Sequence, residues 1–133
     1  MSGEKNLNQL LQSIKPVLNN GEYVFCTTND ISTIVPEKVV SVFKEKEGYT
    51  LILEKTLADN LKLNYSYIAS WITLSVHSSL EAIGLTAAFS NALAKHKISC
   101  NVIAGFYHDH IFVDKDKAEI AMAVLKELAN IEQ

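Results

Sequence analysis

Cysteine, excess basic charge and long apolar runs are all scarce in this sequence. Its 133 residues include two cysteines, Cys26 and Cys100, too few for a disulfide framework or a cysteine-based zinc site. Lysine and arginine number 12 against 15 acidic residues, and a net charge of −3 argues against a nucleic-acid binder. No apolar run approaches the roughly 18 residues of a membrane span, and the N-terminus lacks a secretory signal. We therefore expect a cytoplasmic protein that binds neither nucleic acid nor membrane.

Sequence motifs of the common nucleotide and metal enzymes are also missing. There is no P-loop, no G-x-G-x-x-G and no H-E-x-x-H. Ser78 and Ser79 follow His77 but lack the G-x-S-x-G elbow of a serine nucleophile, and Ser78 with Glu81 forms a capping box instead. The sequence predicts a protein that is not an enzyme and holds no cofactor.

What is present is the pattern of an α+β protein with enough apolar residues, 48%, for a core without disulfides. Apolar and turn residues of the first half predict a helix from Leu7 to Ile14, a strand at 23–27, a loop at 28–38, a hairpin of 39–43 with 49–53, and a short helix at 56–63 capped by Thr56. Those of the second half predict a strand at 65–77, a helix to about Lys97, strands at 98–107 and 110–113, and a helix at 115–129 capped by Asp114.

The order β-α-β-β-α in the second half fits a split βαβ arrangement, with two helices on one face of an antiparallel sheet. That arrangement needs a fourth strand, for which Tyr23–Thr27 in the N-terminal segment is one candidate. We expect two ferredoxin-like units of βαββαβ type, a degenerate one at residues 1–64 and a complete one at 65–133.

An aromatic sheet face is predicted on the strand at 65–77. Tyr65, Tyr67 and Trp71 alternate with apolar residues that face the helices, and an exposed antiparallel face is normally more polar than this. Two interpretations stay open: the N-terminal helix covers this face, or a second copy of the chain does.

Histidines gather at one end of the predicted sheet. His77 ends one strand, and His108, Asp109 and His110 form the turn between the next two, so the topology brings them near one another. Imidazoles and a carboxylate suit a metal ion such as zinc or nickel, or a general acid or base. They suit the polar groups of a small ligand better than a metal, and a solvated polar loop is the simplest interpretation.

The stretch from His77 to Val113 resembles the ACT domain, in the variant found in the regulatory domains of aspartokinases. The resemblance rests on the glycine-aliphatic turn Ile83-Gly84-Leu85, the passage from Leu93 to Val102, and Asp109 before the triplet Ile111-Phe112-Val113. The whole chain is similar to small stand-alone proteins built from two ACT domains, whose role is mostly unassigned.

The resemblance implies that a small molecule, usually an amino acid, binds near main-chain groups of Ile83, Gly84 and Leu85 and of Ile103 and Ala104 on the facing strand. A helix N-terminus holds a carboxylate without a basic side chain, and glycine permits close approach. The chain departs from the family at Ala104-Gly105, where the family has serine and threonine.

Three hypotheses follow. The first is a non-catalytic amino-acid-binding regulatory module, possibly a homodimer, with His77 and His108 contributing to the ligand site. The second is a metal-binding or histidine-assisted enzyme at His77, His108 and His110. The third is a structural oligomerisation module that has lost its ligand site.

Overall fold

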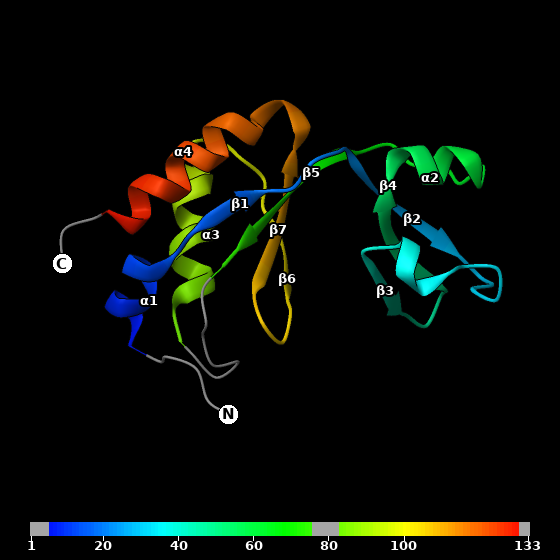
Figure 1. Ribbon diagram of the computed structural model, residues 1–133, viewed down its shortest axis with the longest axis horizontal. Helices are drawn as coiled ribbons and strands as arrows, with labels where there is room; N and C mark the ends of the chain where they lie inside the picture. The colour runs from blue at the N-terminus through cyan, green and yellow to red at the C-terminus, as the bar shows by residue number, and fades with distance from the viewer. Residues whose placement is uncertain (1–5, 76–82, 131–133) are drawn as a thin grey trace. The chain divides into compact units, whose positions relative to one another are not determined.

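The computed structural model describes residues 6–75 and 83–130 (Figure 1). The chain divides into two compact units, which we call unit 1 (Met1–Asn20 with Ser70–Gln133) and unit 2 (Gly21–Ala69). Unit 1 is thus assembled from both ends of the chain, and unit 2 is the segment between them.

Unit 1 is built on a sheet whose strand order is β1 (Pro16–Leu18), β5 (Ile68–Leu74), β7 (Asp109–Asp114) and β6 (Asn101–Ala104). β1 pairs with β5 and β6 pairs with β7, both antiparallel. β1 is the outermost strand of this unit, where Pro16, which has no N–H to donate, is tolerated as a first strand residue.

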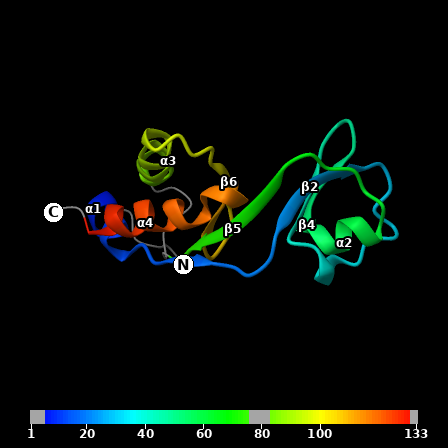
Figure 2. The same cartoon turned by 90° about the horizontal axis from the view of Figure 1, so that it is seen from above.

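One face of this sheet packs against α1 (Leu7–Ser13), α3 (Leu85–Lys95) and α4 (Ala118–Ala129), which gather over unit 1 (Figures 1 and 2). Side chains alternate along a strand, so each strand contributes every second residue to the core. The core residues of the strands are Ile72 and Leu74 on β5 and Ile111 and Val113 on β7. The opposite face therefore carries Trp71, Thr73, His110 and Phe112.

Capping residues set the ends of the helices in unit 1. The Asn6 side chain accepts a hydrogen bond from the Gln9 N–H at 3.2 Å and starts α1, which ends before Pro16. Asp114 accepts from the Asp116 N–H at 2.8 Å, and this caps a 3-10 turn at Lys115–Lys117 that leads into α4. The predicted cap at Asp114 is confirmed, although regular α-helix begins only at Ala118.

Unit 2 has the strand order β3 (Ser41–Lys44), β4 (Tyr49–Glu54), β2 (Tyr23–Thr28) and the first residues of β5. Its one α-helix is α2 (Lys55–Asn60), and a single 3-10 turn, η1 (Pro36–Lys38), lies in the connection where unit 1 has α3. Its buried core consists of Val24, Cys26, Leu51, Leu53 and Ala58. Both units are ferredoxin-like, as the sequence predicts.

The N-terminal segment pairs with β5 at two places. Pro16–Leu18 pairs with Ile72–Leu74 in unit 1, and Tyr23 and Val24 pair with Ala69 and Ile68 in unit 2. The strand that joins the β-α-β-β-α half is thus β1, not the candidate at 23–27. The division at residues 64 and 65 stays a prediction, since the compact units are not two consecutive halves.

Other sequence-based expectations need correction. α2 begins at Lys55, so Thr56 lies inside the helix and Glu54 occupies the cap position. β6 ends at Ala104 and not at residue 107 as predicted, and Phe106, within the predicted strand, is 70% exposed because the chain has already turned there. The capping box at Ser78 and Glu81 lies outside the described residues.

The N-terminal helix does not cover the aromatic face. Leu10 and Ile14 belong to the same buried core as α3 and α4, on the helix side of the sheet. Since Trp71 points to the other side, the interpretation that α1 shields it is wrong.

Candidate functional site

The glycine-aliphatic turn forms the start of α3. Gly84 has φ +93°, a left-handed conformation, and a Cβ there would lie 3.2 Å from Cδ2 of Leu7 in α1. The Ala88 N–H donates to the Gly84 carbonyl at 2.9 Å and closes the first helical turn. Backbone conformation and crowding together explain why this position is glycine.

No side chain of the described residues caps this helix start, and its first turn contains no acidic residue. Leu85 is buried in the core, whereas Ile83 is 85% exposed. The first N–H groups of a helix have no intrahelical partner and carry a partial positive charge. The turn therefore presents donors that suit a carboxylate.

Ile103 and Ala104 lie on β6, opposite His110 and Asp109 of β7. The Gly105 N–H donates to the His108 carbonyl at 2.9 Å and closes the hairpin between the two strands. In Figure 1 this hairpin and the first turn of α3 lie toward the same end of unit 1.

The departure from the family at Ala104-Gly105 has a steric cause in this hairpin. A Cβ on residue 105 would lie 2.9 Å from the His108 carbonyl oxygen and 3.3 Å from Cδ2 and Nε2 of His110. Real Cβ contacts are not this short, so a side chain here requires a shift of the backbone. The His110 imidazole occupies the space beside this glycine.

His110 belongs to a hydrogen-bonded network on the sheet face away from the helices. The Trp71 Nε1–H donates to His110 Nδ1 at 3.1 Å, and Thr73 Oγ1 lies 3.1 Å from the same nitrogen. The Asn19 side-chain amide donates to Thr73 Oγ1 at 3.0 Å. An indole N–H only donates, so Nδ1 accepts and the proton of the neutral imidazole is on Nε2. Burial and the nearby His108 both lower the pKa of His110.

His108 and His110 lie together, with ring centroids 6.4 Å apart. Nδ1 of His108 is buried without a hydrogen-bond partner among the described residues, and burial raises the pKa of Asp109. His77, the third predicted ligand, lies outside the described residues. Within residues 6–75 and 83–130, no group of three histidine, cysteine or acidic side chains is arranged to hold a metal.

The predicted site residues thus lie on two sides of the sheet. Gly84 and Leu85 are on the helix side, since Leu85 belongs to the core that α3 shares with the strands. His110 is on the opposite side with Trp71. Sequence reasoning missed this tryptophan–histidine contact because it joins residues 39 positions apart.

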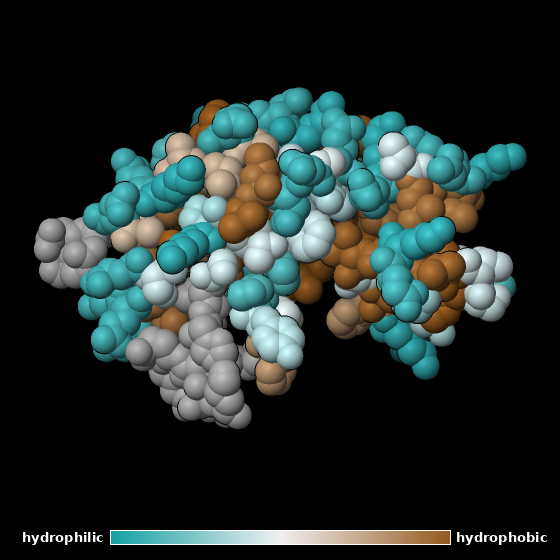
Figure 3. Space-filling model, viewed as in Figure 1, coloured by the Kyte–Doolittle hydropathy of each residue, from teal (hydrophilic) through white to brown (hydrophobic). Residues whose placement is uncertain are grey.

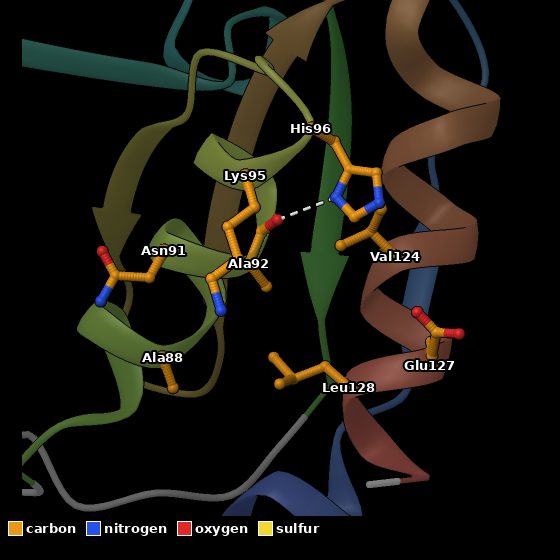
Figure 4. A pocket seen from close by; sticks show the side chains of 8 residues that line it. All are labelled: Ala88, Asn91, Ala92, Lys95, His96, Val124, Glu127 and Leu128. Carbon is orange, nitrogen blue, oxygen red and sulfur yellow. Dashed lines mark hydrogen bonds between the residues drawn. The ribbon is translucent and has the colours of Figure 1, made fainter.

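A pocket that the sequence did not predict lies between α3 and α4 in unit 1 (Figure 4). Its volume is about 280 Å³, and its apolar wall is formed by Ala88 and Ala92 from α3 and Val124 and Leu128 from α4. Above the wall, His96 Nδ1 lies 3.1 Å from the Ala92 carbonyl oxygen, a distance at which its N–H donates. The two alanines leave space between the helices that larger side chains would fill.

Models of the ACT domain match residues 2–70 and residues 66–127 of the chain. The chain belongs to the ACT-domain family. ACT domains are generally regulatory, non-catalytic modules that bind small molecules. The resemblance noted from the turn at Gly84 is therefore confirmed, and it extends to the N-terminal half.

Several solved structures share the fold of this chain. A Vibrio cholerae protein of unknown function, VC0802, named as a possible transport protein, is 52% identical over 94% of this chain and 97% of its own, with a TM-score of 0.84. The regulatory subunit of aspartate kinase from Thermus thermophilus has a TM-score of 0.62 at 8% identity, covering 86% of this chain and 98% of its own.

Aspartokinase III from Escherichia coli, solved with aspartate and ADP, has a TM-score of 0.64 at 12% identity, covering 85% of this ACT protein and 32% of its own chain. No match was found among curated proteins. None of the helices in the described part of the chain has the length and apolar character needed to cross a membrane.

Proposed function

We propose that this ACT protein is a cytoplasmic regulatory module without catalytic activity, which binds an amino acid at the first turn of α3. The ligand carboxylate accepts hydrogen bonds from the main-chain N–H groups at Gly84, Leu85 and Thr86. The observation that supports this placement is a helix start with no side-chain cap, closed by a left-handed glycine.

Further contacts come from the hairpin end of the sheet. Ile103 and Ala104 supply main-chain groups, and His77 and His108 supply polar side chains. Nε2 of His110 lies 3.3 Å from the position that a Cβ at Gly105 would take, but on the face of the sheet opposite Leu85, so this donor is not among the proposed contacts. No described residue accepts a hydrogen bond from this nitrogen.

A homodimer is the second part of the proposal. On the sheet face away from the helices of unit 1, Phe112 is already buried within one chain, and the partly buried Trp71, Thr73 and His110 form the surface proposed to meet a second copy. An amino acid bound near this end of unit 1 changes the association of two copies, or of one copy with the protein that it regulates. The regulated activity lies outside residues 2–127, which the two ACT matches cover.

The test uses a charge placed in the first turn of α3. Ala87 is exposed, so Ala87→Glu puts a carboxylate beside the N–H groups that the ligand needs. A glutamate there stabilises the helix by about 0.3–1 kcal/mol through the helix dipole, and it repels the ligand carboxylate. We expect Ala87→Glu to raise the melting temperature of the free protein and to weaken amino-acid binding.

Ligands are found first by thermal shift, with each protein amino acid and with Zn²⁺, Ni²⁺ and Mn²⁺, because a ligand at 100 times its dissociation constant adds about 2.7 kcal/mol. The matched control is Ala123→Glu, an exposed alanine in the interior of α4. Unchanged affinity in Ala87→Glu refutes binding at this turn. A shift with metal alone supports the histidine site instead.

A further inference from the structure

The pocket between α3 and α4 carries charges of opposite sign beside an apolar wall. Lys95 lies on the α3 side and Glu127 on the α4 side (Figure 4). Neither forms an ion pair with any residue in the described part of the chain. Both charges remain available to a ligand.

The apolar wall sets the size and chemistry of the occupant. Val124 and Leu128 are buried, and Ala88 and Ala92 are partly buried, so methyl groups line the space between the helices. A volume of about 280 Å³ is below the roughly 300–1,000 Å³ of pockets for drug-sized ligands. The pocket therefore suits a molecule of amino-acid size rather than a nucleotide.

We propose that this pocket binds a small zwitterion with a branched apolar side chain, such as L-leucine. Lys95 binds the carboxylate, Glu127 binds the ammonium group, and the side chain packs on Ala92 and Leu128. This site is independent of the proposed function, because its proposed ligand contacts are Ala92, Lys95, Glu127 and Leu128 and include none of the N–H groups at Gly84, Leu85 and Thr86.

The first experiment compares three ligands by NMR titration of the full ¹⁵N-labelled chain: L-leucine, 4-methylpentanoate and 3-methylbutylamine. The last two each lack one of the charged groups. We expect L-leucine to shift the amide signals of Ala92, Val124 and Leu128, and each truncated ligand to bind roughly tenfold more weakly.

Variants then assign each contact. Ala92→Leu fills the pocket and is expected to abolish the shifts, whereas Ala94→Leu, on an exposed position of the same helix, leaves them unchanged. Lys95→Met removes the preference for L-leucine over 3-methylbutylamine, and Glu127→Gln removes its preference over 4-methylpentanoate. Lys126→Met and Glu119→Gln are exposed controls on α4. The two charge variants keep the test valid if Ala92→Leu fails to fold.

Several results overturn the proposal. One is equal binding of the three ligands, and another is an unchanged affinity for L-leucine in both charge variants. A third is a set of shifts confined to the first turn of α3, which refutes this site and supports the proposed function. Shifts at Ala92 and Leu128 that persist in Ala87→Glu support the pocket and show that it binds independently of the first turn.

Discussion

The four strands of unit 1, β6-β7-β5-β1, and those of unit 2, β3-β4-β2-β5, follow the same topological order. The two units differ in the helices that cover these strands. In unit 1, α1, α3 and α4 enclose a core of 14 buried residues, whereas in unit 2, α2 covers a buried core of five. Both units expose apolar side chains, but in unit 2 they include neighbouring residues of the edge strand β3, Phe43 at 66% and Val42 at 39%. In unit 1 the most exposed, Ile83, Phe106 and Tyr107, lie outside the strands. Apolar surface is visible over unit 2 in Figure 3.

The difference originates in the segment between the first two strands of each unit. In unit 1 this segment contains α3, which buries Leu85, Phe89 and Leu93 at helical spacing. In unit 2 the corresponding residues include Asn29, Asp30 and Pro36 and form no helix beyond one 3-10 turn. The fold therefore tolerates the loss of one helix, at the expense of an edge strand left uncovered.

The largest effect is expected from a core phenylalanine of unit 1. Phe89 is 0% exposed and lies in the centre of the larger core, so Phe89→Ala is expected to lower the free energy of unfolding by about 3–5 kcal/mol. Phe43→Ala, the same change on the uncovered strand of unit 2, is expected to stay within about 0.5 kcal/mol. Urea denaturation followed by circular dichroism measures both.

A comparable loss in both variants contradicts this comparison. It would mean that Phe43 is buried in solution, for instance by a second copy of the chain. Repeating the Phe43→Ala measurement at several protein concentrations distinguishes that case, because stability that comes from association rises with concentration.

The next largest loss of stability is expected from a substitution in the β6–β7 hairpin of unit 1. A Cβ at Gly105 would lie 2.9 Å from a backbone oxygen, so Gly105→Ala is expected to destabilise the protein by about 1–3 kcal/mol and to move the His110 ring. The chain has a single tryptophan, whose indole N–H bonds this ring, so its fluorescence reports the displacement.

Tyr107→Ala, at a 70% exposed position of the same hairpin, serves as the control and is expected to leave fluorescence and stability nearly unchanged. An unchanged tryptophan signal in Gly105→Ala shows that the glycine does not hold His110 in place.

Local sequence patterns predicted most of unit 1, because periodicity and capping act over a few residues. The core positions Ile72, Leu74, Ile111 and Val113 follow from strand alternation, and the turn at Gly84 follows from its residue types. β1 was missed because Pro16 indicates a break in structure, and it becomes acceptable only at the start of an outer strand.

The parts of the candidate site that were missed depend on distances between elements. The contact of Trp71 with His110 needs β5 and β7 to be neighbours, and the pocket at Ala88 and Ala92 depends on the separation of α3 from α4. A sequence shows which residues can donate, accept or leave space, but tertiary packing decides which of them meet.

A smaller effect is the pH dependence of folding stability, which has a different origin in each unit. Burial and His108 lower the pKa of His110 below its ordinary value of 6.5, so the unfolded chain binds this proton first as the pH falls. The contribution of His110 is complete above pH 6.5 and is lost as the pH falls toward the lower, folded-state pKa. His110→Gln, which keeps an acceptor but cannot titrate, is expected to flatten the stability profile below pH 6.5.

Asp109 does not account for the change of stability with pH that we assign to His110. Burial raises the pKa of Asp109 above 3.8, so its contribution is favourable at low pH and is lost as the pH rises through the folded-state pKa. The exposed His96→Gln is the matched control, and an equal flattening in both variants refutes the assignment to His110.

The smallest effect belongs to unit 2, where the titrating group is exposed. The Tyr65 hydroxyl donates to Asp59 at 2.7 Å and Lys55 Nζ donates at 3.1 Å, and both lower the pKa of Asp59 below 3.8. The stabilisation is present above pH 3.8 and is lost as the pH falls through the lower, folded-state pKa. Asp59→Asn should therefore change the stability profile only in acid, below the range in which His110 acts.

Salt and Tyr65→Phe separate the two contributions at Asp59. High salt screens the exposed Lys55 pair but leaves the tyrosine hydrogen bond, which is the larger cause of the lowered pKa. We therefore expect Tyr65→Phe to remove more of the acid-range effect of Asp59 than high salt does. The reverse order would mean that charge, rather than hydrogen bonding, stabilises the end of α2. The pH dependence of unit 2 would then come from an exposed ion pair, whereas that of unit 1 comes from a buried histidine.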